Sequence, residues 1–232
     1  MMNKNVKYYI VKFWKEWGYS LLVAVLVATS FKSVIADWND VPTGSMKPTI
    51  LEGDRVFVNK LAYDLKIPYT TIRVATWDHP ERGDIVVLFS PADDKRLVKR
   101  VVGIPGDIIE MKNNQLYINQ QAVEYSNSTH QSRKKFGNDI PSIAITYNEF
   151  LPGRNHTVMF LPDFRSIHTF GPMQLPENKY FIMGDNRDNS IDSRFFGLVD
   201  RKAIVGQASA VVLSRKGSFL HPRWDRFFSD LN

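Results

Sequence analysis

The sequence contains no cysteine among its 232 residues. This absence excludes a disulfide framework, a thiolate metal site and a cysteine nucleophile. It does not identify the compartment, because a chain of this length can fold without disulfide bonds. Histidine is also scarce, and none of the five histidines lies in a recognisable catalytic-triad motif. A serine nucleophile in this chain would therefore need a different base, and lysine is the available one.

A strong basic surplus is missing from most of the chain. The net charge is +6, but residues 1–36 carry five lysines against one glutamate, which leaves only +2 for the other 196 residues. This distribution argues against a nucleic-acid surface. With 44% hydrophobic and 23% charged residues, the composition is that of a globular protein. The length allows one domain that carries a substantial insertion.

Only one long apolar run is present, at residues 18–36. As a helix it would span roughly 28 Å, about the thickness of a bilayer core, with its one charge, Lys32, near the end. The lysines before it alternate with aromatic residues, as in a cytoplasmic interfacial flank. We predict one membrane anchor over 1–36, with a cytoplasmic N-terminus. A cleaved signal peptide and a buried core helix are the alternatives, and the one-sided lysine flank argues against the second.

The rest of the chain has short apolar segments separated by Gly, Pro and Asn or Asp, which is typical of β-strands. The predicted strands are Arg55–Asn59, Asp84–Ser90, Leu97–Gly103, Asp107–Met111, Gln115–Asn119, His156–Leu161, Lys179–Met183 and Ala203–Leu213. Asn113 and Asn114 predict a hairpin, because asparagine tolerates positive φ. No amphipathic helix is expected beyond the anchor, and Ser126–Asn138 is expected to be a mobile surface loop.

These patterns predict a mostly β protein. Its β-rich catalytic core of antiparallel sheets would comprise residues 37–111 and 178–232. A smaller inserted β-domain or loop region would occupy 112–177, and one N-terminal transmembrane helix within 1–36 would precede the core.

Ser45 lies in an unusual segment, residues 41–49, with the sequence VPTGSMKPT. Pro42 and Pro48 stiffen the chain, and Gly44 permits a tight turn that exposes the serine. A serine hydroxyl is a poor nucleophile until a neighbouring base takes its proton.

Lys99 is the candidate base. In a strand over residues 97–102, alternation places Leu97, Lys99 and Val101 on one face. The apolar neighbours would desolvate the ammonium and lower its pKa, as a base near neutrality requires. A lysine on an edge strand that points to water is the alternative.

A third polar segment follows the apolar strand that ends at Met183. Residues 183–194 read MGDNRDNSIDSR. A solvated loop is one explanation, but three carboxylates with two arginines also suit an ion-paired scaffold. Ser190 in this segment could orient the amine of the lysine.

Together, these segments resemble the type I signal (leader) peptidase family of bacteria, which are serine proteases with a Ser/Lys dyad. The motifs are PTGSMKPT, RGDIVV near residue 82, LVKRVVGIPGD near residue 97, and GDNRDNSIDSRFFG. The match covers most of residues 37–110 and 178–210. Each motif is weak alone, whereas their order and spacing after an N-terminal anchor are specific.

The resemblance implies that Ser45 is the nucleophile and Lys99 the general base. It implies an oxyanion hole formed by the Ser45 backbone N–H and the Thr43 hydroxyl. Ser190 matches the serine that orients the lysine. The supporting ion pairs that it implies are Asp185–Arg100 and Asp192–Arg194.

The resemblance also implies a substrate and a location. In the family, residues matching Val41 and Val98 line shallow pockets that accept small residues at positions −1 and −3 of the substrate, counted back from the cleaved bond. Strand alternation, however, places Val98 on the face away from Lys99. The enzyme would remove signal peptides from exported preproteins, with no metal, cofactor or nucleic acid. It would be a single-pass protein of the cytoplasmic (inner) membrane, in contact with lipid and with its catalytic domain on the periplasmic or extracytoplasmic side.

The chain departs from the family in three respects. The best-known long members have two membrane spans, Thr43 replaces a serine found in several members, and the disulfide of some inserted domains cannot form. Three other functions remain possible. They are a membrane-tethered binding protein with a degenerate protease fold, a self-cleaving repressor, and a conjugation-type peptidase with one dedicated substrate. The repressor would need a DNA-reading helical domain where this chain has its apolar run.

Overall fold

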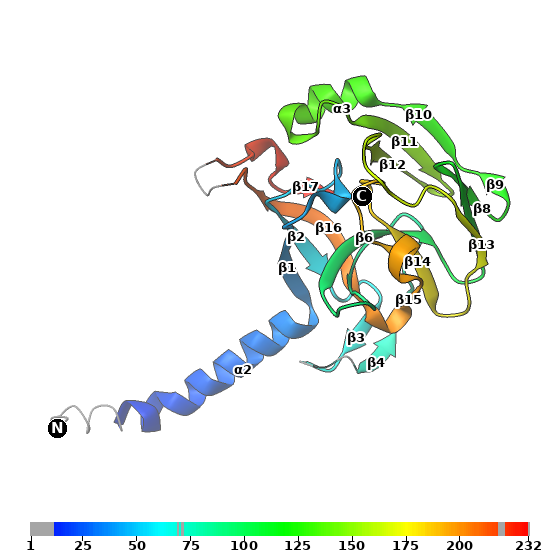
Figure 1. Ribbon diagram of the computed structural model, residues 1–232. Coiled ribbons are helices and arrows are strands. Elements are labelled where there is room, and N and C mark those ends of the chain that lie inside the picture. Colours follow the sequence, from blue (N-terminus) through cyan, green and yellow to red (C-terminus); the bar gives the residue numbers. More distant parts are fainter. Residues whose placement is uncertain (1–11, 69, 71, 218–220, 232) are drawn as a thin grey trace.

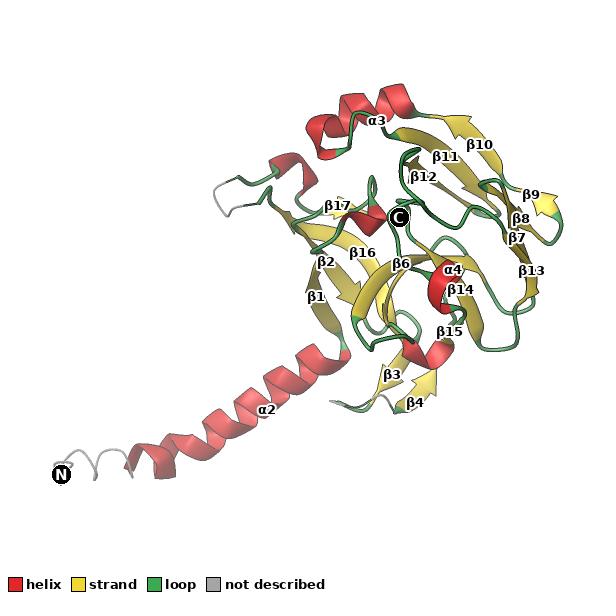
Figure 2. Cartoon of the chain, in the orientation of Figure 1, coloured by secondary structure: helices red, strands yellow, loops and turns green. Residues whose placement is uncertain are grey.

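The computed structural model describes residues 12–68, 70, 72–217 and 221–231. Figure 1 shows a β-rich body from which one helix near the N-terminus projects. The first part of the predicted lysine-rich flank, residues 1–11, lies outside the described residues. Figure 2 shows that strands dominate the body and that helices are few and mostly short.

The largest sheet is antiparallel throughout and includes the strand that carries Lys99. Its strands, in spatial order, are β1 (Ala36–Asp40), β2 (Asp54–Asn59), β16 (Ile204–Ser214), β5 (Ile85–Phe89), β6 (Arg96–Gly103), β14 (Lys179–Met183) and β15 (Val199–Asp200), and β17 (Ser229–Asp230) pairs with β16. The order brings the C-terminal β14 and β16 next to β5 and β6, so the two halves of the predicted core form one sheet.

Three smaller antiparallel sheets complete the body. The first contains β13 (Phe170–Gln174), β7 (Ile108–Lys112), β8 (Gln115–Ile118) and β9 (Gln121–Ala122); the second contains β10 (Glu124–Asn127), β11 (Ile145–Leu151) and β12 (Arg154–Phe160); the third is the hairpin of β3 (Asp64–Lys66) and β4 (Arg73–Thr76). The first two use the middle of the chain. The proposed division at residues 112 and 177 remains a prediction.

The mostly β fold class is confirmed, and each of the eight predicted strands overlaps a strand of the structure. The Asn113–Asn114 hairpin is also confirmed. Both residues have positive φ, 50° and 67°, and they join β7 to β8. The strands β3 and β9 have only three and two residues, too few to show an alternating pattern, which explains why the sequence did not reveal them.

The helix α2 runs from Tyr19 to Val34 and follows a π-helical turn, η1 (Trp14–Gly18). In the part of the chain that the structure describes, we find no helix with both the length and the apolar composition needed to cross a membrane. The predicted transmembrane helix is therefore not confirmed. The other helical segments are α3 (Thr129–Phe136), α4 (Ser193–Phe196) and the 3₁₀ turns η2 (Gly44–Met46), η3 (Gly137–Asp139), η4 (Arg201–Ala203) and η5 (Trp224–Arg226).

The expectation of a surface loop at residues 126–138 was wrong, because α3 occupies much of it. This helix packs on β11 through hydroxyl groups. Thr146 donates to Ser132 Oγ at 2.8 Å, and the Thr129 hydroxyl bonds to the backbone N–H and carbonyl of Thr146. An amphipathic pattern is the usual signal of a packed helix, and a contact made by hydroxyl groups leaves no such signal in the sequence.

The hydrophobic core extends to the residues around Ser45. Val41, Met46 and Ile50 are buried in one cluster with β-strand residues such as Val56 and Val87. A fully buried side chain of this kind contributes about 1.5–3 kcal/mol relative to an exposed one. The segment that carries Ser45 is therefore held on both sides of the serine by core packing.

Candidate active site

Ser45 lies in the 3₁₀ turn η2, directly after the chain leaves β1. The turn is closed by a hydrogen bond from Lys47 N to Gly44 O at 3.1 Å, and Ile50 N donates to Met46 O at 2.9 Å. Ser45 itself is half-buried, between the buried Gly44 and Met46. The backbone thus presents the serine side chain at the surface of the core while its neighbours anchor it.

Lys99 comes from β6 in the middle of the large sheet, and its Nζ lies 2.7 Å from Ser45 Oγ. The Nζ atom also donates to the carbonyl of Val98 at 3.2 Å. Only 2% of Lys99 is exposed, so it is not the edge-strand lysine of the alternative reading. As alternation predicted, Leu97 and Val101 join one hydrophobic cluster, whereas Val98 packs against another.

Burial makes the neutral amine of Lys99 more accessible than that of an exposed lysine. Burial lowers the pKa of Lys99 from 10.5 to about 8, even though the charges of Asp192 and Asp185 act in the opposite direction. At a pH near 8 about half of the molecules would thus have a deprotonated lysine. In that state the Ser45 hydroxyl can donate its proton to Nζ across the same 2.7 Å contact, as general-base catalysis requires.

Both ion pairs implied by the resemblance are formed and buried. Arg100 donates from Nε and Nη2 to the two oxygens of Asp185, each at 2.8 Å, and from Nη1 to Gly83 O at 2.7 Å. Burial raises the pKa of Asp185, but the charge and hydrogen bonds of Arg100, together with His156 and Thr49, outweigh it and hold this pKa below its ordinary range. The pair joins β6, which carries Lys99, to the loop after β14.

The second pair joins Asp192 to Arg194 within the last motif. Two hydrogen bonds of 2.8 Å connect the guanidinium to the carboxylate, and neither side chain is exposed. Asp192 also accepts from Gly184 N at 3.0 Å and caps the start of α4 through Arg194 N. One carboxylate thus holds both ends of the loop over residues 184–194.

Ser190 is buried, and its Oγ has no hydrogen-bond partner among the described residues. It therefore makes no hydrogen bond to Lys99, the contact that its implied role would need. A Cβ atom added to Gly184 would lie 2.3 Å from Ser190 Oγ and 2.4 Å from Ser45 O. Glycine at this position therefore allows Ser190 to lie close to the backbone of Ser45.

The remaining predicted residues surround the serine. Thr43 is exposed, with an extended backbone immediately before the turn η2. Val41 is buried in the same cluster as Met46, and the half-buried Val98 packs against that cluster. Val41 and Val98 therefore lie in one apolar region, although Val41 directly follows β1 and Val98 belongs to β6. The described residues contain no group of three or more histidine, aspartate or glutamate side chains that could hold a metal ion.

Asn186 was not singled out from the sequence, yet it holds the segment that carries Ser45. Its backbone N–H donates to Ser45 O at 3.1 Å, and its side-chain Nδ2 donates to Gly44 O at 3.0 Å. Thr49 contributes a second link, because its hydroxyl donates to Asp185 Oδ2 at 2.5 Å. The only sign of this role in the sequence was the density of polar residues in 183–194. That density does not reveal which residues they bond to.

Comparison with known proteins identifies the family of this chain. Residues 14–213 match the family described as "Signal peptidase, peptidase S26". The chain is 37% identical over 199 residues to signal peptidase I S of Bacillus subtilis, covering 84% of this chain and 87% of that protein. It is 33% identical over 214 residues to signal peptidase I of Pseudomonas aeruginosa, covering 86% and 72%.

A crystal structure of a signal peptidase I from Enterococcus faecalis is 28% identical and covers 58% of this chain, but its TM-score of 0.36 is too low to support a statement about the fold. The family match spans most of the chain, including every candidate site residue. The chain belongs to the signal peptidase family, peptidase S26, and is a serine peptidase.

Proposed function

We propose that this peptidase removes signal peptides from exported preproteins through a dyad in which Ser45 is the nucleophile and Lys99 the general base. Preproteins with signal peptides are the substrates of signal peptidases. The observation that carries the proposal is the 2.7 Å contact between Ser45 Oγ and a buried lysine Nζ. Pairs of serine and lysine are a known variant of the catalytic triad.

The reaction starts with neutral Lys99, which takes the Ser45 proton while Oγ attacks the scissile carbonyl carbon. The carbonyl oxygen becomes an oxyanion in a tetrahedral intermediate. When the intermediate collapses, the C–N bond breaks and the Lys99 ammonium gives its proton to the leaving amine. A water molecule then attacks the acyl-enzyme, with Lys99 again as base, and releases the acid and free Ser45.

Thr43 and the Ser45 backbone N–H would donate to the oxyanion. Thr43 is exposed and adjacent to the serine, so its hydroxyl is free to turn towards a bound substrate. The substrate would bind in an extended conformation, as a β-strand added beside strands of the enzyme. Val41 and Val98 would form the shallow apolar surface against which small side chains at −1 and −3 pack.

Replacing Thr43 with valine tests the oxyanion hole. The variant keeps the shape of the side chain and removes its donor, so the turnover number should fall by about 10²- to 10³-fold. The Michaelis constant should change little, because the oxyanion exists only in the transition state. Steady-state kinetics on one peptide separate the two constants, and Thr43→Ser is the matched control that keeps the hydroxyl. A change in the Michaelis constant alone would make Thr43 a residue of the binding cleft.

The specificity for small residues is tested with a preprotein and its variants. Incubation with the full chain, followed by mass spectrometry of the products, should give one cut after a small residue at −1. Ala→Leu at −1 should reduce cleavage severely, because a shallow pocket excludes a large side chain by steric clash. Ala, Gly and Ser should differ weakly, since one methylene is worth only about 1–3 kcal/mol. Equal cleavage of the leucine variant would contradict the proposed pocket.

We also propose that the enzyme is held at the cytoplasmic membrane by its N-terminal segment, with the catalytic body outside. Signal peptidases of this family are generally membrane-associated. Two observations support the membrane contact. Apolar side chains of α2, including Leu22, Val25 and Leu26, are exposed along the helix that projects from the body. The β3–β4 hairpin and its flanks also expose apolar side chains, among them Ile72 and Val74.

A further inference from the structure

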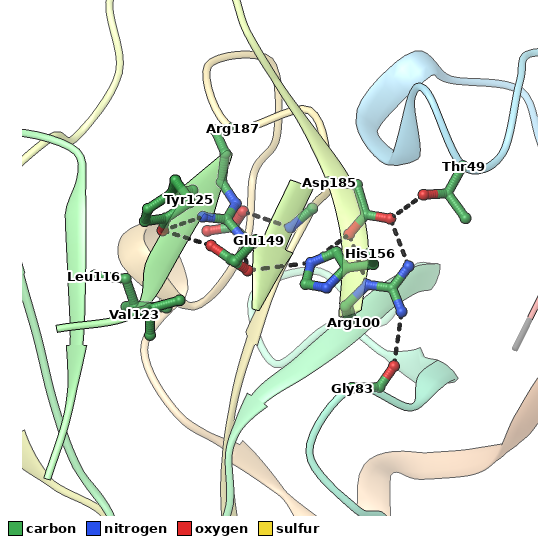
Figure 3. A network of polar contacts seen from close by, with 12 residues as sticks. Thr49, Gly83, Arg100, Leu116, Val123, Tyr125, Glu149, His156, Asp185 and Arg187 are labelled. Atoms are coloured by element: carbon green, nitrogen blue, oxygen red, sulfur yellow. Dashed lines mark hydrogen bonds and ion pairs between the residues drawn. The ribbon is translucent and has the colours of Figure 1, made fainter. Parts of the chain in front are cut away.

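A buried polar cluster lies behind the nucleophile segment and is not needed for the proton transfers described above. It connects the β10–β12 sheet to the loop after β14 (Figure 3). Its charged and hydroxyl-bearing members are Thr49, Arg100, Tyr125, Glu149, His156, Asp185 and Arg187. The two arginines and the two carboxylates balance one another in charge, so the cluster is neutral when His156 is neutral.

The half of the cluster in the β10–β12 sheet centres on Glu149 of β11. Its carboxylate forms an ion pair with Arg187, and both side chains are at least 98% buried. Tyr125 of β10 also donates to Glu149 Oε1 at 2.5 Å. Burial alone raises the pKa of Glu149, but the charge of Arg187 and the contact with His156 hold this pKa far below its ordinary range. Glu149 is therefore a fixed negative charge.

His156 of β12 lies between this half and Asp185. Its Nε2 is 3.1 Å from Glu149 Oε2 and 3.7 Å from Asp185 Oδ1, and Figure 3 shows the ring between the two carboxylates. Burial and the charge of Arg100 lower the pKa of His156, so the ring is neutral at ordinary pH. Neither ring nitrogen meets the geometry of a hydrogen bond among the described residues, but Nε2 is the one that lies near both carboxylates. The single ring proton is therefore favoured on Nε2, because a lone pair there would face the two anions.

From Asp185 the contacts lead directly to the nucleophile. The next residue, Asn186, holds the carbonyls of Gly44 and Ser45 through its backbone and side chain. The same loop is also bonded to β12, since Met159 N donates to Asp185 O and Arg187 N donates to Met159 O, each at 2.8 Å. The backbone that holds Ser45 is thus clamped between β12 and the buried cluster.

We propose that Glu149 and His156 are positioning residues for the dyad, so that the β10–β12 sheet is part of the catalytic apparatus. Neither residue touches Ser45 or Lys99. They act through Asp185 and Arg187, which flank Asn186, and they hold the Ser45 backbone at the distance that its contact with Lys99 requires. The inference rests on the proposed function of Ser45 and Lys99.

The cluster has a physical reason to act as a unit. In a buried site each charge is stable only while its partners remain, because an unpaired buried charge is costly. Removal of the Nε2 proton donor would leave Glu149 and Asp185 facing each other without a proton between them. Their repulsion would displace the loop that carries Asn186, and a shift of about 1 Å in a catalytic group can cost on the order of a hundredfold in rate.

The test compares two substitutions of His156 in the full chain. In His156→Gln the side-chain amide places an N–H near the position of Nε2, whereas His156→Leu keeps much of the volume and has no donor. We expect the turnover number of H156L to fall about 10- to 100-fold with an unchanged Michaelis constant, and that of H156Q to stay within about threefold of the wild type. Glu149→Gln should resemble H156L. The exposed His130 of α3 supplies the control variant His130→Leu.

Rates are divided by the folded fraction, measured by thermal melting under the assay conditions. A lower melting temperature with unchanged turnover per folded molecule would overturn the proposal, because it would show a purely structural role. Equal activity of H156L and H156Q would also overturn it. If H156L does not fold, His156→Asn replaces it, since its shorter amide cannot reach the Nε2 position. Failure of the proposed function is recognised separately, because Ser45→Ala would then remain active whatever the His156 variants do.

Discussion

Ser45→Ala should abolish cleavage of a preprotein while the chain stays folded. The substitution removes Oγ, the atom 2.7 Å from Lys99 Nζ, and with it the covalent route through an acyl-enzyme. Loss of a nucleophile in such a catalytic unit costs on the order of 10⁴- to 10⁶-fold in turnover. Far-ultraviolet circular dichroism and thermal melting establish that the variant is folded. Turnover within tenfold of the wild type would show that Ser45 is not the nucleophile.

The matching substitution at the base is Lys99→Arg. It keeps the positive charge but cannot supply a neutral base, because the pKa of arginine lies above about 12. The loss of turnover should approach that of S45A, and the double variant should lose no more than either single one, because the two residues act as a unit. An active K99R would limit Lys99 to an electrostatic role. The half-buried Lys60, which pairs with Asp37 at 3.3 Å, offers Lys60→Arg as a control.

The second large effect is expected for Asp185→Ala. This change leaves the guanidinium of Arg100 buried without its carboxylate, and the two side chains are only 3% and 1% exposed. Breaking a buried pair by removal of one partner costs about 3–5 kcal/mol, which is a large part of a domain stability of about 5–15 kcal/mol. Chemical denaturation should show this loss. Turnover should fall as well, because Thr49 loses its hydrogen bond to Asp185 and the loop that carries Asn186 loses its ion pair with Arg100.

A matched control for that experiment is Asp93→Ala. Asp93 pairs with Lys95 at 2.6 Å, a similar distance, but the lysine side chain is 76% exposed. Exposed ion pairs contribute little to stability, so the free energy of unfolding should hardly change. If the free energy of unfolding fell by a similar amount in both variants, burial would not explain the effect of Asp185→Ala. The buried ion pair of Asp185 and Arg100 would then not be a special support of the site.

The local features of the site were predictable from the sequence because they depend on short-range rules. Lys99 is buried, and Leu97 and Val101 join one hydrophobic cluster while Val98 packs against another, as strand alternation over residues 97–102 indicated. The hairpin at Asn113–Asn114 follows from the tolerance of asparagine for positive φ. The dense polar motif at 183–194 indicated an ion-paired loop. Which aspartate pairs with which arginine was implied only by the family resemblance.

The parts that could not be predicted depend on contacts between distant segments. Nothing in the sequence around Glu149 and His156 reveals that Glu149 meets Arg187, and His156 meets Asp185, in the interior. Likewise, Asn186 acquires its partners only when the loop after β14 is brought against the turn η2. Helix α3 was missed because hydroxyl groups, rather than an apolar face, hold it to β11.

The central claim is that a buried, neutral Lys99 is the base, and the pH dependence of kcat/KM tests it most directly. Burial lowers the pKa of Lys99 to about 8, and the base is active only when deprotonated. For the full chain and one peptide, kcat/KM should therefore rise about tenfold per pH unit below this value and level off above it. A control titration of the folded state by circular dichroism excludes unfolding. A profile that is flat through pH 8, or one that keeps rising to the ordinary lysine pKa of 10.5, would contradict the account.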